Sequence, residues 1–252
     1  MAQIVASDVT VKYGGVKALS GVGFSAAGGQ AVGIIGPNGA GKSTFLNVLS
    51  GFHKPSAGSI VLDGKRLPCG RGYSFARAGV VLAWQSTRLF ARLTVLENLL
   101  VNRLGRPEGS QGHVGPREML GRVGDGEVEE GVLFLERMAL GEHLSRYASD
   151  LSGGQRRLLE LARAMWLRPR VLLLDEPSVG VAPAMRRTVM ESLQRECLDQ
   201  GGTVIVVEHE LEVIEKLCQQ VYVLISGEMV TKGSLSEVMR HPDVRRGYLG
   251  LG

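Results

Sequence analysis

The fold of this chain is decided by a nine-residue stretch, Gly36-Pro37-Asn38-Gly39-Ala40-Gly41-Lys42-Ser43-Thr44. A short apolar run at residues 30–35 precedes it, and apolar residues at helical spacing follow it as far as Gly51. This strand–loop–helix order around the pattern GxxxxGK[ST] predicts a phosphate-binding loop in an α/β fold. A chance match is the alternative, and it is expected in roughly one of 100 shuffled sequences of this composition.

The residue types of this loop explain what it can bind. Glycines let consecutive backbone N–H groups turn inward around a phosphate, and the N-terminus of the following helix adds positive potential. Lys42 supplies a mobile cation for phosphate oxygens, and Ser43 supplies a hydroxyl for Mg²⁺. The sequence therefore predicts a nucleotide site.

The bulk composition limits the class of protein. The chain has 252 residues, of which 44% are hydrophobic and 21% charged, as is ordinary for a globular protein with a substantial core. Its formal net charge of +4 suits phosphate ligands, an anionic membrane surface or nucleic acid, and does not choose among them. The three cysteines lack CxxC spacing, so we expect neither a metal site built from them nor a disulfide framework. We expect no signal peptide, and the apolar runs are shorter than the ~18 residues that span a bilayer.

Patterns along the chain predict one domain over residues 1–252 with an inserted helical part. Strand and turn patterns dominate the first segment, and continuous apolar runs at 171–174 and 203–207 predict strands buried on both faces of a parallel sheet. We assign about 1–85 and 169–252 to a nucleotide-binding core, and about 86–168 to a helical subdomain. Within the latter, Gly105 to Gly126 has no periodicity and is predicted to be a loop. Residues 221–230 predict a hairpin.

A second string of residues places a serine and two glycines before a helix, in the order Leu151-Ser152-Gly153-Gly154-Gln155. An exposed helix N-terminus of this kind suits an anion. The alternative is an ordinary helix that Ser152 caps.

A third pattern, at residues 171–177, predicts two carboxylates at the C-terminal end of a buried strand, beside the phosphate loop. Asp175 can hold Mg²⁺ directly or through water, and Glu176 can polarise an attacking water as a general base. The alternative is a pair of acidic residues at a helix N-terminus.

With these motifs, the chain resembles the ABC ATPase family, whose signature sequence is LSGGQ, over essentially its whole length. The resemblance implies a P-loop NTPase core of the ABC type, an inserted helical signature subdomain and an N-terminal antiparallel β subdomain. In that family the signature of one subunit closes over the γ-phosphate held by the phosphate loop of the other. The resemblance therefore implies a dimer with a second ABC ATPase subunit, with two ATP molecules and Mg²⁺ at the interface.

The resemblance also implies roles for single residues. Gln85 matches a glutamine that senses Mg²⁺ and the γ-phosphate, His209 matches a switch histidine, and Tyr13 matches an aromatic residue that stacks on adenine; each could instead be structural. Catalysis would depend on Lys42, Glu176 and His209, and metal binding on Ser43, Gln85 and Asp175. The implied nucleotide contacts are Tyr13, Gly36, Pro37, Asn38, Gly39, Ala40, Gly41, Lys42, Ser43, Thr44, Gln85, Ser152, Gly153, Gly154 and Gln155.

Finer resemblance points to one branch of the family. Residues 87–90 and 93–100, the stretch 178–183 and the ending 243–250 are similar to ATPases of branched-chain amino-acid and urea importers. Lipopolysaccharide-export ATPases share a similar ending, so an exporter ATPase is an alternative. Ala182 stands where the wider family carries an aspartate, which leaves open how closely the two ATP sites communicate.

An importer ATPase would work as a peripheral protein on the cytoplasmic face of the inner membrane. Its partners would be transmembrane permease subunits and, indirectly, a solute-binding protein, with no nucleic acid. Two further alternatives are a nucleic-acid-linked ABC ATPase and a nucleotide-binding regulatory subunit without turnover. The transported solute and the identity of the partner ATPase stay open.

Overall fold

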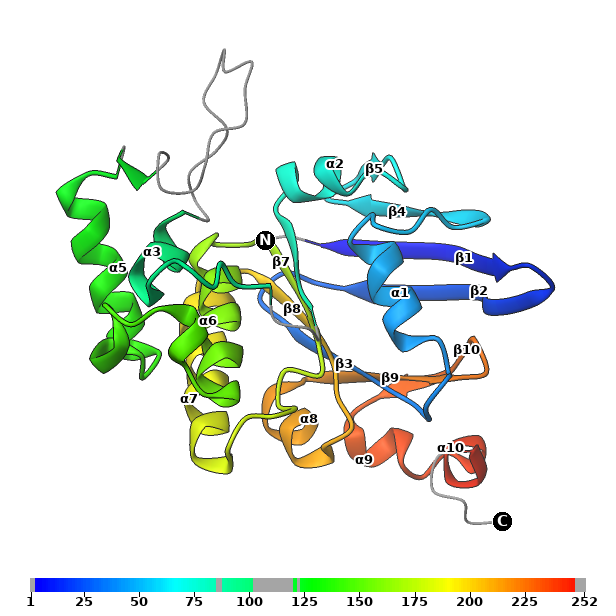
Figure 1. Cartoon of the computed structure of the whole chain (residues 1–252). Coiled ribbons are helices and arrows are strands. Elements are labelled where there is room, and N and C mark those ends of the chain that lie inside the picture. The colour runs from blue at the N-terminus through cyan, green and yellow to red at the C-terminus, as the bar shows by residue number, and fades with distance from the viewer. Residues whose placement is uncertain (1–2, 85–87, 102–119, 122, 248–252) are drawn as a thin grey trace. The chain divides into compact units, whose positions relative to one another are not determined.

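The computed structural model describes residues 3–84, 88–101, 120–121 and 123–247 (Figure 1). Two compact units make up the chain, which we name the core unit and the helical unit. The core unit comprises Met1–Gln85, Pro169–Ser178 and Gln194–Gly252, and the helical unit comprises Ser86–Arg168 and Val179–Leu193.

The core unit contains two sheets. The first is antiparallel with the order β2-β1-β4-β5, and its strands are β1 (Ile4–Tyr13), β2 (Val16–Ala26), β4 (Ala57–Leu62) and β5 (Lys65–Leu67). The second has the order β10-β9-β3-β8-β7-β6 and is parallel except for its edge strand β10. Its strands are β3 (Ala31–Ile35), β6 (Val80–Ala83), β7 (Val171–Asp175), β8 (Thr203–Val207), β9 (Gln220–Ile225) and β10 (Glu228–Gly233).

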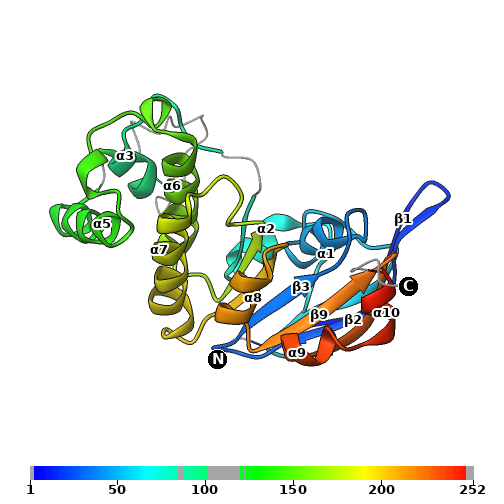
Figure 2. The same cartoon turned by 90° about the horizontal axis from the view of Figure 1, so that it is seen from below.

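Helices cover both faces of the parallel sheet, which explains its continuous apolar strands. All residues of β3 and β8 are buried. Phe45 of α1 (Lys42–Leu49) is fully buried in one core with residues of both sheets, and Figures 1 and 2 show α1 beside β3. On the other face, a Cβ at Gly33 would lie 2.9 Å from Cδ1 of Ile214, which shows how closely α8 (Leu211–Leu217) packs on β3. The remaining helices of the core unit are α2 (Gly72–Arg77), a π-helix (Gln194–Leu198), α9 (Leu235–Val238) and α10 (Pro242–Gly247).

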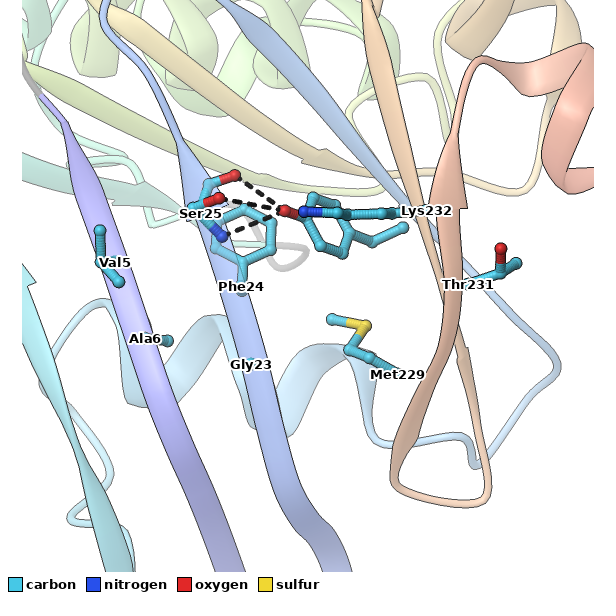
Figure 3. Close-up of a pocket in the computed structure, with 9 residues that line it drawn as sticks. Val5, Ala6, Gly23, Phe24, Ser25, Met229, Thr231 and Lys232 are labelled. Carbon is cyan, nitrogen blue, oxygen red and sulfur yellow. Dashed lines mark hydrogen bonds between the residues drawn. The ribbon is translucent and has the colours of Figure 1, made fainter.

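Tyr222 and Ser25 join the two sheets directly. The Tyr222 hydroxyl donates to the Ser25 carbonyl at 3.1 Å and accepts from the Ser25 N–H at 3.2 Å (Figure 3). An open groove of about 480 Å³ lies beside this contact, and Lys232 lies over the Tyr222 ring at 5.7 Å from its centroid. The groove is lined by Val5, Ala6, Gly23, Phe24, Ser25, Tyr222, Met229, Thr231 and Lys232. None of these residues belongs to the predicted nucleotide set, so the groove is not part of that site.

The helical unit contains capped helices and a buried asparagine. Its helices are α3 (Val95–Leu100), α5 (Asp125–Arg137), α6 (Gly153–Trp166) and α7 (Pro183–Leu193), with single 3-10 turns at Gly141–His143 and Ala148–Asp150. Thr94 caps α3 in a reciprocal capping box with Glu97. The fully buried Asn98 amide donates to the carbonyls of Phe90, Leu93 and Thr94, which fixes the entry to α3.

The predicted fold class is confirmed, including the antiparallel β subdomain and the parallel sheet. Three details differ from the sequence interpretation. Helix α7 belongs to the helical unit, because Gly154 of α6 packs against the Gly180 carbonyl and Met185. Helix α5 begins at Asp125, inside the range predicted to be a loop, and β10 extends to Gly233, beyond the predicted hairpin. Gln85, Thr87 and most of the predicted loop Gly105–Gly126 lie outside the described residues.

Among the helices that the structure describes, none is both long and apolar enough to cross a bilayer.

Candidate functional site

The phosphate-binding loop connects β3 directly to α1. Gly36, Gly39 and Gly41 all have positive φ angles, of 155°, 78° and 102°. Gly41 is the N-cap of α1, and no side chain caps this helix and no acidic residue lies in its first turn. Helices α3, α6 and α9, by contrast, each carry a reciprocal capping box. The first-turn N–H groups of α1 are therefore left for another acceptor, as an anion site requires.

The glycines of the loop differ in how tightly they are packed. A Cβ at Gly36 would lie 2.0 Å from the Leu224 carbonyl oxygen, and one at Gly41 would lie 2.6 Å from the Ala18 carbonyl oxygen. A Cβ at Gly39 would meet nothing within 4 Å. The two ends of the loop are thus fixed against neighbouring backbone, while its middle faces open space.

We therefore expect Gly36→Ala to destabilise the protein more than Gly39→Ala. Both substitutions put alanine at positive φ, which costs about 1–2 kcal/mol, but only Gly36→Ala adds a clash with rigid backbone, for a total of ~3 kcal/mol or more. Urea unfolding of the two variants measures this difference. Equal midpoints would show that the loop does not pack against β9 as described.

Lys42 lies in the loop with its charge directed inward. The side chain is buried, and Nζ donates hydrogen bonds to the carbonyls of Gly36, at 2.8 Å, and Pro37, at 2.9 Å. Burial lowers the pKa of Lys42, and the negative charges of Glu176 and Asp175 oppose this effect. The fold therefore brings the phosphate loop and the predicted carboxylates within electrostatic reach of each other, although they are separated by more than a hundred residues of sequence.

The two carboxylates follow β7 at the C-terminal edge of the parallel sheet. Asp175 pairs with Val207 of β8 in the parallel ladder, and the Glu176 N–H donates to the Val207 carbonyl at 2.9 Å. Glu176 has a φ of 49°, a left-handed conformation that costs a non-glycine residue about 1–2 kcal/mol. Its Oε1 lies 2.9 Å from Nε2 of His209, which follows β8. Neighbouring parallel strands thus bring a potential base and a histidine into hydrogen-bond contact.

Of the three residues predicted to hold Mg²⁺, Ser43 and Asp175 lie in the described residues and carry oxygen atoms, the donor type that Mg²⁺ prefers, whereas Gln85 lies outside them. Ser43 is exposed at the start of α1, and Asp175 is half-buried. Among the described residues no group of three or more His, Cys, Asp or Glu side chains could enclose a metal. Mg²⁺ does not need such a cage, because it usually binds one or two protein oxygens and keeps waters and substrate phosphates as its other ligands.

The signature residues lie at the start of α6 in the helical unit. Ser152 Oγ accepts the Gln155 N–H at 3.2 Å, and Gln155 Oε1 accepts the Ser152 N–H at 2.9 Å. The N-cap alternative considered for Ser152 is therefore present. It does not exclude an anion contact, because a hydroxyl that accepts one bond can still donate another. A Cβ on Gly153 would meet nothing within 4 Å, so a ligand can approach the backbone there.

Tyr13 lies at the end of β1 and is 50% exposed. Its ring packs against His53, with the centroids 5.1 Å apart and the planes tilted by 50°. An exposed ring of this kind can stack on a planar base.

Three polar residues near these positions were not singled out from the sequence. His53 contacts Tyr13, His143 Nε2 lies 2.7 Å from Gln155 Nε2, and the buried Glu208 accepts two backbone N–H groups. The first two stand in no motif, so no sequence pattern marks them. The sequence could have identified Glu208. A charged residue that directly follows an apolar strand and precedes His209 is expected at the edge of the sheet where the site lies.

Comparison with known proteins agrees with these motifs. The family described as ABC transporter matches residues 19–179. The high-affinity branched-chain amino acid transport ATP-binding protein LivG of Salmonella typhimurium is 34% identical over 248 residues, which are 98% of this chain and 97% of LivG. The corresponding protein BraF of Pseudomonas aeruginosa is also 34% identical, over 97% of this chain and 96% of its own.

Solved structures give the same result. The ADP conformation of an ATP-binding cassette of an ABC transporter superposes with a TM-score of 0.82 at 30% identity, covering 99% of both chains. The dimeric structure of a bacterial ABC transporter cassette superposes with a TM-score of 0.76 at 26% identity, covering 92% of this chain and 98% of its own. This chain therefore belongs to the ABC transporter family, as one of its ATP-binding cassettes.

Proposed function

We propose that this chain hydrolyses ATP, with Mg²⁺, to energise a membrane importer of branched-chain amino acids or a related small solute. The observation that carries the proposal is the convergence in the core unit of Lys42, Asp175 and the Glu176–His209 pair. The solute class is supported by LivG and BraF, which are branched-chain amino acid transport proteins by name and align over nearly the whole chain.

In the proposed reaction the residues of the site divide the work of binding the nucleotide and activating the water. Backbone N–H groups of the loop and Lys42 hold the β- and γ-phosphates, Tyr13 contacts adenine, and Glu176 accepts a proton from the attacking water. Mg²⁺, held by Ser43 and Asp175 with Gln85, would neutralise the charge of the phosphates. His209 contacts the γ-phosphate and orients Glu176 through their hydrogen bond.

We further propose that two such cassettes act together at the cytoplasmic face of the membrane, beside permease subunits. Residues 152–155 of each would cover the phosphates bound to the other. The open space at Gly153 supports this arrangement, as does the dimeric structure of a related cassette.

Replacing Gly153 by alanine tests this arrangement with little risk to the fold. The added Cβ meets no atom of this chain, and alanine is a better helix former than glycine, so we expect an unchanged or slightly higher melting temperature. We expect ATP binding to the isolated cassette to be unchanged and turnover at saturating Mg-ATP to fall at least tenfold, because the methyl group occupies the approach path of the partner's phosphate. Phosphate release measures the turnover, and size-exclusion chromatography with ATP measures whether the two cassettes still form a dimer.

The matched control for this substitution is Gly126→Ala. Gly126 also lies in the first turn of a helix, α5, and its Cβ would also meet nothing within 4 Å. Turnover of Gly126→Ala should match wild type. Wild-type turnover in Gly153→Ala would contradict the assigned role of the signature.

A further inference from the structure

The loops that carry Glu176 and His209 are tied together beyond the ends of their strands. The β7–β8 ladder ends at the Asp175–Val207 pair. The next link is the Glu176 N–H bond to the Val207 carbonyl. Two residues beyond Glu176 and one beyond Val207, the Ser178 N–H donates to Glu208 Oε1 at 2.8 Å. A side chain therefore continues the connection where the backbone ladder has stopped.

Glu208 makes this last link with a buried carboxylate. The residue is 1% exposed, and its second oxygen, Oε2, accepts the N–H of His209 at 3.2 Å. Within the described ranges no lysine, arginine or histidine forms an ion pair with it, and its hydrogen-bond donors there are these two backbone N–H groups. Burying a carboxylate raises the free energy of the folded state unless hydrogen bonds offset the lost hydration. The two N–H groups and the carboxylate are therefore expected to hold one another in place.

We propose that Glu208 is a positioning residue for ATP hydrolysis: its carboxylate clamps the segment after Glu176 to the turn that carries His209 and so maintains the 2.9 Å contact between them. The inference rests on the proposed ATPase function. It extends that function, because the proposed role of Glu208 is exerted through its two neighbours and not by contact with nucleotide or water. The left-handed Glu176 makes the clamp necessary, since a strained residue keeps its conformation only if its surroundings hold it there.

The first test is Glu208→Gln in the full chain. Glutamine preserves the volume but replaces one acceptor oxygen by an NH₂ group, so one of the two backbone N–H groups faces a donor. We expect kcat for ATP hydrolysis to fall at least tenfold while KM for ATP stays within about twofold, because the phosphate loop is untouched. Glu208→Asp keeps both acceptors on a shorter stem and should recover part of the lost kcat.

A double-mutant cycle separates positioning from general damage. If Glu208 acts through His209, Glu208→Gln should cost much less in a His209→Ala background than in wild type. Single-turnover measurements with labelled ATP can measure the slow hydrolysis expected of the His209→Ala variants.

Ile214→Val is the stability control, because it deletes a buried methyl group on α8 and changes neither of the two loops. It should lower the melting temperature and leave kcat at the wild-type value.

A second readout does not require turnover. Hydrogen exchange of the Ser178 and His209 amides should be slow in wild type, and at least one should exchange faster in Glu208→Gln by more than the change in global stability allows. Wild-type kcat in Glu208→Gln, additive effects in the cycle, or unprotected amides in the wild type would each overturn the proposal. Absence of phosphate release from the wild type would instead refute the proposed ATPase function, and the exchange data alone would then decide whether the clamp exists.

Discussion

Substitution of Glu176 by glutamine is expected to lower kcat for ATP hydrolysis by about 10²- to 10⁴-fold, the usual contribution of a general base, while ATP binding is retained. Glutamine can still reach His209 and occupies the same volume, so the loop after β7 should keep its conformation. An amide cannot take up the proton of the attacking water, so ATP should remain bound. Chromatography with ATP should therefore show a stable dimer.

The control for this substitution is Glu215→Gln, which removes the same charge from the exposed side of α8. It should leave both turnover and chromatographic behaviour unchanged.

In cells, chromosomal Glu176→Gln should abolish uptake of labelled leucine, isoleucine or valine if the importer assignment is correct. Unchanged phosphate release by Glu176→Gln would show that another group serves as the base.

Replacement of Lys42 by methionine is expected to weaken ATP binding by about 10- to 100-fold. Each hydrogen bond to a charged group contributes about 1.5–3 kcal/mol, and Lys42 is the buried cation of the loop. Methionine keeps most of the apolar stem, so the packing around α1 should survive. Equilibrium titration with a fluorescent ATP analogue measures the dissociation constant.

Lys65→Met on β5 is the matched control, because Lys65 is exposed and outside the predicted nucleotide set. It removes one positive charge from the core unit, so it corrects for the effect of net charge on a polyanionic ligand. A similar affinity loss in both variants would mean that Lys42 acts only through long-range electrostatics. Unaltered affinity in Lys42→Met would remove the basis of the proposed phosphate site.

The local motifs could be predicted from the sequence because their structure depends on residues that are neighbours in the chain. Gly36 to Thr44 form a loop and a helix start within nine positions, and their glycines adopt the positive φ angles that the pattern requires. Ser152 and Gln155 form a capping box because they are three residues apart at a helix N-terminus. Continuous apolar runs marked β7 and β8 as buried strands for the same reason.

Other features of the site depend on pairings between distant segments. The order β3-β8-β7 places Glu176 beside His209 although 33 positions separate them (209 − 176), and it allows Glu208 to reach the Ser178 N–H. The contact of His143 with Gln155, and the packing of α7 on α6, likewise follow from side chains that meet only after folding. A sequence motif indicates which residue types a site needs, because local backbone geometry follows from residues that are neighbours in the chain. Which distant residues hold those groups in place is decided by strand order and packing, because these depend on the free energy of the whole fold.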